Sequence, residues 1–222
     1  MPVDRLVEIS AAGAKLQGNL NIPDDPLGLV VFAHGSGSSR FSPRNRFVAG
    51  ELQQARLGTL LVDLLTTGEE SLDDVTAEYR FDIPLLSTRV VDTVDWLSGQ
   101  DDMRHLPLGT FGASTGAAAA LITAAERPDR VAAVVSRGGR PDLAAEVLPR
   151  VKAPTLLIVG GNDLPVIRLN RDALDLLRSE KRMQVIPGAT HLFEEPGALE
   201  EVAILARDWF ASHFPAAGKR AA

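Results

Sequence analysis

Apolar residues along this chain gather in short continuous runs that alternate with helical patterns. Continuous runs of about five residues are typical of parallel strands that are covered on both faces. The four strongest runs are Leu29–Ala33, Leu57–Leu65, Val131–Val135 and Thr155–Val159. Two weaker runs, Leu106–Phe111 and Met183–Ile186, fit the same series. These runs predict the strands of one sheet.

The first part of the chain has a different pattern. Val3–Ile9 and Lys15–Ile22 alternate between apolar and polar residues, and a short link containing Gly13 joins them. Alternation with a period of two indicates strands with one exposed face, and a short glycine link is typical of a hairpin. We therefore expect an N-terminal antiparallel hairpin beside the parallel strands.

Helical periodicity fills the intervals between the later strands. Apolar residues recur every three or four positions, which predicts helices over Pro84–Leu97, Thr115–Glu126, Val166–Leu177 and Leu199–Phe214. Alternating strands and helices are typical of an α/β sandwich around a mostly parallel sheet, here with about eight strands. We expect a single domain over residues 1–214 and a flexible tail over residues 215–222.

Composition narrows the function classes. The chain has 222 residues and a net charge of −6, which argues against a nucleic-acid-binding surface because such a surface needs a basic face. It has no cysteine, so disulfides and thiolate chemistry are excluded. The start of the sequence lacks an apolar signal segment, and no apolar run approaches the length of a membrane helix. We expect a cytoplasmic protein without a membrane partner.

The clearest chemical motif is Gly112-Ala113-Ser114-Thr115-Gly116. It lies where a predicted strand ends and a predicted helix begins, which is the setting of a nucleophile elbow. In that turn a serine takes strained backbone geometry, and the flanking glycines leave room for strand and helix to approach. The helix N-terminus also directs its positive dipole end toward the serine. We interpret Ser114 as a catalytic nucleophile.

A serine nucleophile needs a base and a group that orients the base, and the elbow predicts the chain order serine, acid, histidine. Asp163 follows the strand Thr155–Val159, and His191 follows the strand Met183–Ile186. Both therefore lie beyond the C-terminal ends of parallel strands, on the same sheet edge as Ser114. Asp63, Glu194 and Glu195 are alternative acids, and the chain order favours Asp163.

An acyl-transfer site also needs backbone donors for the oxyanion. The N–H of Thr115, directly after the nucleophile, is the first candidate. The loop His34-Gly35-Ser36-Gly37 supplies the second, for which we choose Ser36 over its neighbour Gly37. His34 is interpreted as a structural residue of this loop.

Together, the elbow, His34-Gly35-Ser36-Gly37, Asp163-Leu164-Pro165-Val166 and Ala189-Thr190-His191-Leu192-Phe193 resemble the α/β-hydrolase superfamily. The closer resemblance is to dienelactone-hydrolase-like proteins. It implies an eight-stranded sheet and the hydrolysis of esters or related bonds without a metal or organic cofactor. Dienelactone hydrolases proper carry a cysteine in the elbow, whereas this chain has Ser114, which favours serine esterase chemistry over lactone specificity.

Arginines crowd the same predicted edge of the sheet. Arg40, Arg44 and Arg46 follow the glycine-rich loop, and Arg137 and Arg140 follow the strand Val131–Val135. Of these, Arg40, Arg137 and Arg140 are our candidates for substrate binding. Such a cluster can be a solvated face, or it can bind a carboxylate or phosphate of the substrate. A small-molecule ester that carries a negative charge is therefore one candidate substrate.

The predicted substrate is small. Only residues 137–153 separate the strand Val131–Val135 from the next one, which leaves room for one short helix, Asp142–Leu148, and no cap domain. We therefore predict a serine hydrolase of short soluble esters, lactones or thioesters. The alternatives are an acyltransferase or perhydrolase with the same triad, and a binding protein that retains the pocket without turnover.

Overall fold

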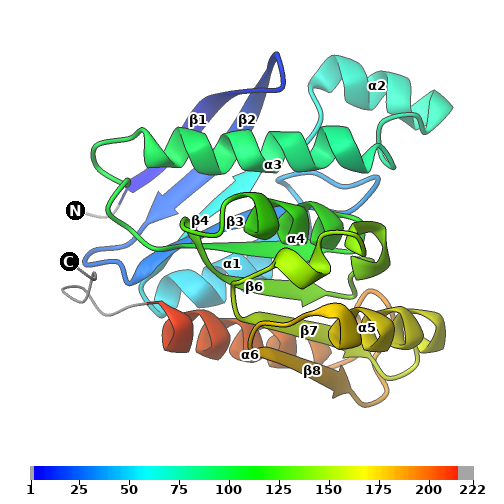
Figure 1. The fold of residues 1–222 in the computed structure, drawn as a ribbon. Coiled ribbons are helices and arrows are strands. Elements are labelled where there is room, and N and C mark those ends of the chain that lie inside the picture. The colour runs from blue at the N-terminus through cyan, green and yellow to red at the C-terminus, as the bar shows by residue number, and fades with distance from the viewer. Residues whose placement is uncertain (1–2, 215–222) are drawn as a thin grey trace.

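Eight strands form one mixed sheet through the centre of the molecule (Figure 1). The computed structural model describes residues 3–214. The spatial order of the strands is β1-β2-β4-β3-β5-β6-β7-β8. Their bounds are β1 (Val3–Ala11), β2 (Ala14–Ile22), β3 (Gly28–Ala33), β4 (Leu57–Val62), β5 (Leu108–Ala113), β6 (Val131–Arg137), β7 (Thr155–Gly160) and β8 (Lys181–Ile186).

The sheet is parallel from β4 to β8, and β2 runs antiparallel to both β1 and β4. Every residue of β3, β4, β5 and β7 is buried, as continuous apolar strands require. The predicted α/β architecture with an N-terminal antiparallel hairpin is confirmed. The carboxyl ends of β3 to β8 consequently share one edge of the sheet.

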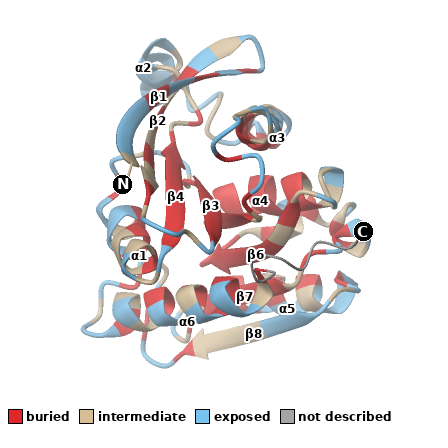
Figure 2. Cartoon of the chain, turned by 90° about the vertical axis from the view of Figure 1, so that its left-hand side faces the viewer, coloured by how far each residue is buried: buried red, intermediate tan, exposed pale blue. Residues whose placement is uncertain are grey.

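Helices cover both faces of the sheet. Their bounds are α1 (Pro43–Gln54), α2 (Thr67–Thr76), α3 (Ile83–Ser98), α4 (Gly116–Glu126), α5 (Leu164–Leu176) and α6 (Ala198–His213). Apolar residues of α3, α4 and α5 pack in the core on one face, and those of α1 and α6 pack in the core on the other. Figure 2 shows the central strands and the inward sides of these helices as buried. The alanines of α4 let this helix lie close to the sheet.

Two helices differ from the sequence prediction. The run predicted as a strand over Leu57–Leu65 ends at Val62, and α2, which was not predicted, begins at Thr67 after its N-cap Thr66. Thr66 and Glu69 form a capping box, in which each side chain accepts a hydrogen bond from the other residue's N–H. The other helix, α1, was not predicted. Its inward face is short and holds only Val48, Ala49 and Leu52 as buried apolar residues.

No cap domain interrupts the connection between β6 and β7. The helix predicted over Asp142–Leu148 is replaced by two 3₁₀ turns, Pro141–Ala144 and Leu148–Arg150. Within residues 3–214, none of the helices has the length and apolar composition needed to cross a membrane. The predicted tail over residues 215–222 lies outside the described residues. The connection between β6 and β7 therefore does not cover the sheet edge that carries the candidate residues.

Candidate active site

Ser114 lies in a sharp turn between β5 and α4. Its φ is +51°, a left-handed conformation that is strained for a residue with a side chain. Hydrogen bonds hold the turn from both sides: the Ser114 N–H donates to the Arg137 carbonyl at 3.2 Å, and the Arg140 N–H donates to the Ser114 carbonyl at 3.0 Å. The predicted elbow is therefore the conformation found, and it leaves the Ser114 side chain half-buried.

The glycines of the motif explain why the turn can close. A Cβ at Gly112 would lie 2.3 Å from the Ala117 Cα, and a Cβ at Gly116 would lie 2.3 Å from the Ala33 carbonyl oxygen. Both contacts are with backbone atoms, which cannot swing away as a side chain can. The two glycines therefore allow β5, β3 and α4 to approach closely beneath the serine.

His191 and Asp163 meet at the same edge of the sheet. His191 lies in the loop after β8, and its ring Nδ1 is 2.6 Å from Asp163 Oδ2 in the loop after β7. Backbone hydrogen bonds join the two loops, from Gly161 N–H to the Ile186 carbonyl and from Asn162 N–H to the Ala189 carbonyl. With Nδ1–H donating to the carboxylate, Nε2 is left as the proton acceptor, which is the tautomer a general base needs.

The other candidate acids are engaged elsewhere. Asp63 forms an ion pair with Arg40, and Glu194 forms one with Arg44 at 3.1 Å. Glu195 is hydrogen-bonded with Thr190, which lowers the pKa of its carboxyl group. Of the four carboxylates considered from the sequence, Asp163 is the one that contacts His191 in the described structure.

Ser114 and His191 line one cavity of about 230 Å³. No direct hydrogen bond joins their side chains among the described contacts, which is common before a substrate is bound. The remaining lining residues come from the loop after β3, the start of α1 and the ends of β5, β6 and β8, namely Gly35, Ser36, Ser38, Ser42, Arg44, Asn45, Ala113, Arg137 and Leu192. The structure thus brings the predicted nucleophile and base to a shared hollow.

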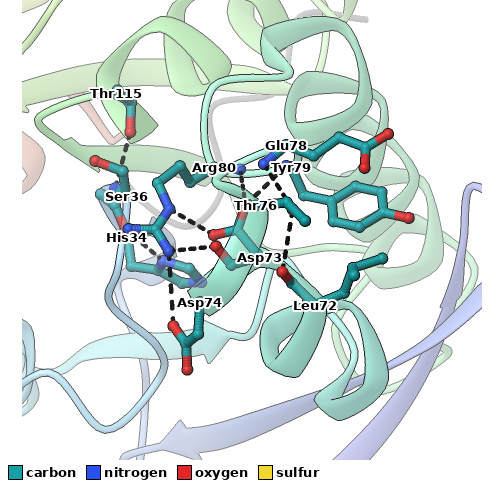
Figure 3. A network of polar contacts seen from close by, with 11 residues as sticks. His34, Ser36, Leu72, Asp73, Asp74, Thr76, Glu78, Tyr79, Arg80 and Thr115 are labelled. Carbon is teal, nitrogen blue, oxygen red and sulfur yellow. Dashed lines mark hydrogen bonds and ion pairs between the residues drawn. The ribbon is translucent and has the colours of Figure 1, made fainter.

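The loop after β3 lies beside the elbow, as predicted. The Ser36 N–H donates to the Thr115 hydroxyl at 3.0 Å, a contact drawn in Figure 3. The N–H of Thr115 itself has no hydrogen-bond acceptor within the described part of the chain. Thr115 is thus free to donate to an oxyanion, whereas Ser36 would have to exchange its present acceptor. The role of Ser36 as an oxyanion donor stays a prediction.

His34 joins two loops and does not face the nucleophile's cavity. Its Nδ1–H lies 2.9 Å from the Gly35 carbonyl, and its Nε2 accepts a hydrogen bond from the Leu64 N–H at 2.9 Å. Burial lowers the pKa of His34, so the ring is neutral at physiological pH and can accept that bond. These contacts fit the structural role inferred from the sequence.

A second, smaller cavity of about 50 Å³ lies on the α2 side of the same loop. Figure 3 shows Arg80 there between Asp73 and Asp74, near the loop that carries Ser36. Arg80 Nε donates to Asp73 Oδ2 at 2.6 Å, and its Nη2 donates to the Asp73 carbonyl. This cavity is rich in carboxylates, because Asp63, Glu70, Asp73 and Asp74 all line it.

The three arginines singled out from the sequence have different surroundings. Arg40 is paired with Asp63 and lies over the Phe41 ring, and Arg140 is paired with Asp142 at 2.7 Å. Neither lines the cavity of Ser114. Arg137 does line it, and its Nε and Nη1 are buried without a hydrogen-bond partner in the described structure.

Burial lowers the pKa of Arg137. The side chain is only 7% exposed, and loss of solvation lowers its pKa to about 10, with a smaller contribution from the positive charge of Arg44. Arg137 is still charged at neutral pH, and among residues 3–214 it has no acidic partner of the kind that a buried cation ordinarily requires. Arg44 and Asn45 lie with it along the cavity, at the start of α1. The sequence placed Arg44 in the arginine cluster without choosing it as a substrate-binding candidate, and it gave no role to Asn45. The N-cap Ser42 and the following Pro43 were the signal that a helix begins there.

No group of three or more histidine, aspartate or glutamate side chains among residues 3–214 is arranged to hold a metal ion.

Comparison with known proteins agrees with this geometry. The profile of the Dienelactone hydrolase family matches residues 74–213, which include Ser114, Asp163 and His191. The chain belongs to the dienelactone hydrolase family. The crystal structure of a dienelactone hydrolase from Anabaena variabilis ATCC 29413 is 60% identical and has a TM-score of 0.95, covering 96% of this chain and 99% of that one. The family supports a hydrolase, as the sequence motifs predicted.

Other relatives share the fold or part of the sequence. Est1E from Butyrivibrio proteoclasticus covers 94% of this chain and 98% of its own with a TM-score of 0.79, but at 15% identity it shows the fold alone. Two Mycobacterium tuberculosis proteins, from strains CDC 1551 / Oshkosh and ATCC 25618 / H37Rv, are named "Putative phosphoribosyl transferase". Each is 53% identical over 95% of this chain, and the match spans 46% of the relative. The chain thus spans about half the length of these curated relatives.

The close approach at the elbow can be tested with Gly112→Ala. The added Cβ meets backbone of α4, so we expect a loss of about 1–3 kcal/mol of unfolding free energy, measured by urea denaturation. Gly50→Ala is the matched control, because a Cβ at that position in α1 meets no atom within 4 Å and alanine favours a helix. Equal stability of Gly112→Ala and wild type would show that the turn does not depend on this glycine.

The unpaired charge of Arg137 leads to an unusual expectation for stability. A pKa lowered from the ordinary value of arginine to about 10 corresponds to a penalty of roughly 3 kcal/mol at neutral pH. Arg137→Met removes this penalty but loses some packing, so we expect it to raise the unfolding free energy by about 1–3 kcal/mol.

The pH dependence of that gain has a definite sign. The native pKa lies below the unfolded one, so the penalty is fully present below about pH 10 and is relieved as the pH rises from there toward the ordinary pKa of arginine. Between pH 6 and 9 the gain of Arg137→Met should therefore be constant in urea denaturation. Arg140→Met, which breaks a partly exposed pair, should instead change stability by less than about 1 kcal/mol in the unfavourable direction. A destabilised Arg137→Met would contradict the assignment of an unpaired charge.

Proposed function

We propose that this chain is a serine hydrolase that cleaves short, soluble carboxylic esters through Ser114, His191 and Asp163. The observation that carries the proposal is the arrangement at one sheet edge. A nucleophile elbow with Ser114 in left-handed geometry shares a cavity with His191, and His191 is held by Asp163 at 2.6 Å. Membership of the dienelactone hydrolase family supports a hydrolase.

The proposed reaction has two halves. Ser114 Oγ attacks the ester carbonyl carbon while His191 Nε2 takes the hydroxyl proton, and the tetrahedral intermediate expels the alcohol with a proton from His191. A water molecule then attacks the acyl-enzyme with His191 again acting as base, which releases the acid and regenerates Ser114. Asp163 keeps the imidazole in the correct tautomer and stabilises the imidazolium that forms in each half.

The oxyanion would be stabilised by the loop contacts around the elbow. The Thr115 N–H has no acceptor in the described structure, so it can donate without breaking a bond. The Ser36 N–H becomes the second donor if the oxyanion replaces the Thr115 hydroxyl as its acceptor. Each such donor contributes roughly 3 kcal/mol of transition-state stabilisation in comparable sites.

The cavity limits the size of the substrate. At about 230 Å³ it is smaller than the roughly 300–1,000 Å³ of drug-sized ligand pockets, and the β6–β7 connection supplies no cap domain. Short acyl and alcohol groups fit this space, in an ester, a lactone or a thioester. The name of the Mycobacterium tuberculosis relatives describes proteins about twice as long as the match, so we do not carry phosphoribosyl transfer over to this chain.

The nucleophile can be tested with a fluorophosphonate probe. Wild-type protein should be labelled in proportion to its concentration, and Ser114→Ala should not be labelled, because the probe reacts with an activated serine hydroxyl. Intact mass spectrometry would locate one adduct per chain. Folded wild-type protein that takes up no label would favour a binding protein over an enzyme.

The acid can be tested by comparing Asp163→Asn with Asp63→Asn. Loss of the carboxylate beside His191 should lower kcat for p-nitrophenyl acetate by about 10³–10⁴, because the wrong tautomer of His191 is favoured. Asp63→Asn weakens the ion pair with Arg40 and should lower stability while changing kcat by less than about tenfold. The reverse result would assign the acid to Asp63.

A further inference from the structure

The cavity of Ser114 contains positive charge that no acid within it balances. Arg137 is 7% exposed, and its Nε and Nη1 lack hydrogen-bond partners in the described structure. The Nε of Arg44 is buried in the same unpaired state. Neither aspartate nor glutamate belongs to the described lining of this cavity. Polar atoms that are buried without partners lower stability, so they need an explanation in terms of a missing ligand or another function.

Strand geometry fixes where the Arg137 side chain points. Residues two apart in a strand share a face, and Val135 belongs to the core beneath α1 and α6. Arg137 therefore points to the same side, toward the start of α1. Its own carbonyl accepts the Ser114 N–H, and its Cα is paired with Ala113 of β5. The backbone of Arg137 is thus held against the same turn that carries the nucleophile, which fixes where its side chain begins.

The start of α1 forms the opposite wall of the cavity. Ser42 caps this helix of 12 residues, and Arg44 and Asn45 lie in its first turn. Asn45 is buried, and its Oδ1 has no donor in the described structure. The dipole of the helix adds to the positive potential of the two arginines. Arg44 has one acidic contact, at 3.1 Å with Glu194, whose side chain is 65% exposed.

The cavity on the other side of the Ser36 loop has the opposite character. Four carboxylates line it, and its arginine, Arg80, is already paired with Asp73. A negatively charged group would be repelled from that side and attracted to the side of Arg137. The charge distribution therefore selects one of the two hollows that adjoin the loop.

We propose that the cavity formed by Arg137, Arg44 and the start of α1 binds a phosphate group of the substrate, beside the ester that Ser114 attacks. This inference rests on the proposed function. Two guanidinium groups and a helix N-terminus match a dianion with oxygens in several directions, and arginine forks bind phosphate through paired hydrogen bonds. Arg44 is already paired with Glu194, so the choice of phosphate rests on its shape: its oxygens point in more directions than those of a planar carboxylate and can meet Arg137 and Arg44 together. The substrate class is thus a short ester that carries a phosphate monoester group.

Inorganic phosphate is the probe for this site. At constant ionic strength, phosphate should raise the melting temperature of the wild-type protein and slow its labelling by a fluorophosphonate. In Arg137→Met the apparent Kd for phosphate should rise by about 10–100-fold, the usual effect of losing hydrogen bonds from a charged group. Arg44→Met, at a more exposed side chain, should weaken phosphate binding as well. Arg46→Met is the matched control, because Arg46 is exposed on the same helix and does not line the cavity.

The outcomes separate this inference from the proposed function. If the fluorophosphonate labels Ser114 but phosphate neither stabilises the protein nor slows labelling, the hydrolase proposal stands and the phosphate site is wrong. If acetate protects as well as phosphate at equal ionic strength, the cavity recognises a carboxylate and the phosphate assignment is wrong. If phosphate binds through Arg137 but Ser114 is never labelled, the hydrolase proposal fails, and with it the assignment of a phosphate-bearing ester.

Discussion

The left-handed turn at Ser114 is the constraint on which the site depends. A strained φ of +51° costs about 1–3 kcal/mol, and it persists because the surrounding structure permits no other path for the chain. Only Ser114 and Thr115 lie between the last residue of β5 and the first residue of α4, so the Ser114 hydroxyl lies at the sheet edge. The absence of side chains at Gly112 and Gly116 is what allows this approach. Short loops after β3, β7 and β8 are then enough to place Ser36, Asp163 and His191 around the Ser114 hydroxyl.

The same edge also carries a conflict between stability and binding. β6 lies between the strand of the nucleophile and the strand of the acid, so its last side chain must enter the site. An apolar residue would be the stable choice there, but the chain has Arg137, buried and without an acid. Stability lost at a functional position is a usual consequence of holding a binding group ready in advance. The lowered pKa of Arg137 and its unpaired nitrogens have the same cause. The guanidinium has lost its hydration on burial without gaining a hydrogen-bond partner for these nitrogens in the described structure.

Much of the architecture could be predicted because buried parallel strands have a simple sequence pattern. The runs that predicted β3, β4, β6 and β7 are continuous since both faces of those strands are covered. The order of Ser114, Asp163 and His191 likewise follows from which strand each residue succeeds. In contrast, α1 escaped prediction because Arg44 and Asn45 of its first turn line the cavity and its buried apolar face is short.

The separate roles of the arginines could not be predicted, because each depends on a contact between distant segments. Nothing in the sequence near Arg40 indicates an acidic partner, but Asp63, which follows β4, forms an ion pair with it. Arg44 and Arg137 lie on different elements, and only the packing of α1 against the sheet brings their charges together. Likewise, the hydrogen bond from Ser36 to the Thr115 hydroxyl connects two loops that are 79 residues apart in the chain. Sequence patterns indicate which edge a residue occupies, but they do not indicate which charges neutralise one another there.

An uncapped site must discriminate between substrates by its fixed groups. The loop after β3 separates the two cavities, and it is held by the contact from Ser36 to Thr115, by that of His34 with Leu64 and by the pair of Arg40 with Asp63. Contacts to the ends of both β4 and β5 leave this loop little freedom to close over a ligand. Selectivity then has to come from the difference in potential across the loop, positive beside Arg137 and negative beside Asp73 and Asp74. A negatively charged substrate would be drawn by this difference to the Ser114 side of the loop before any chemical step.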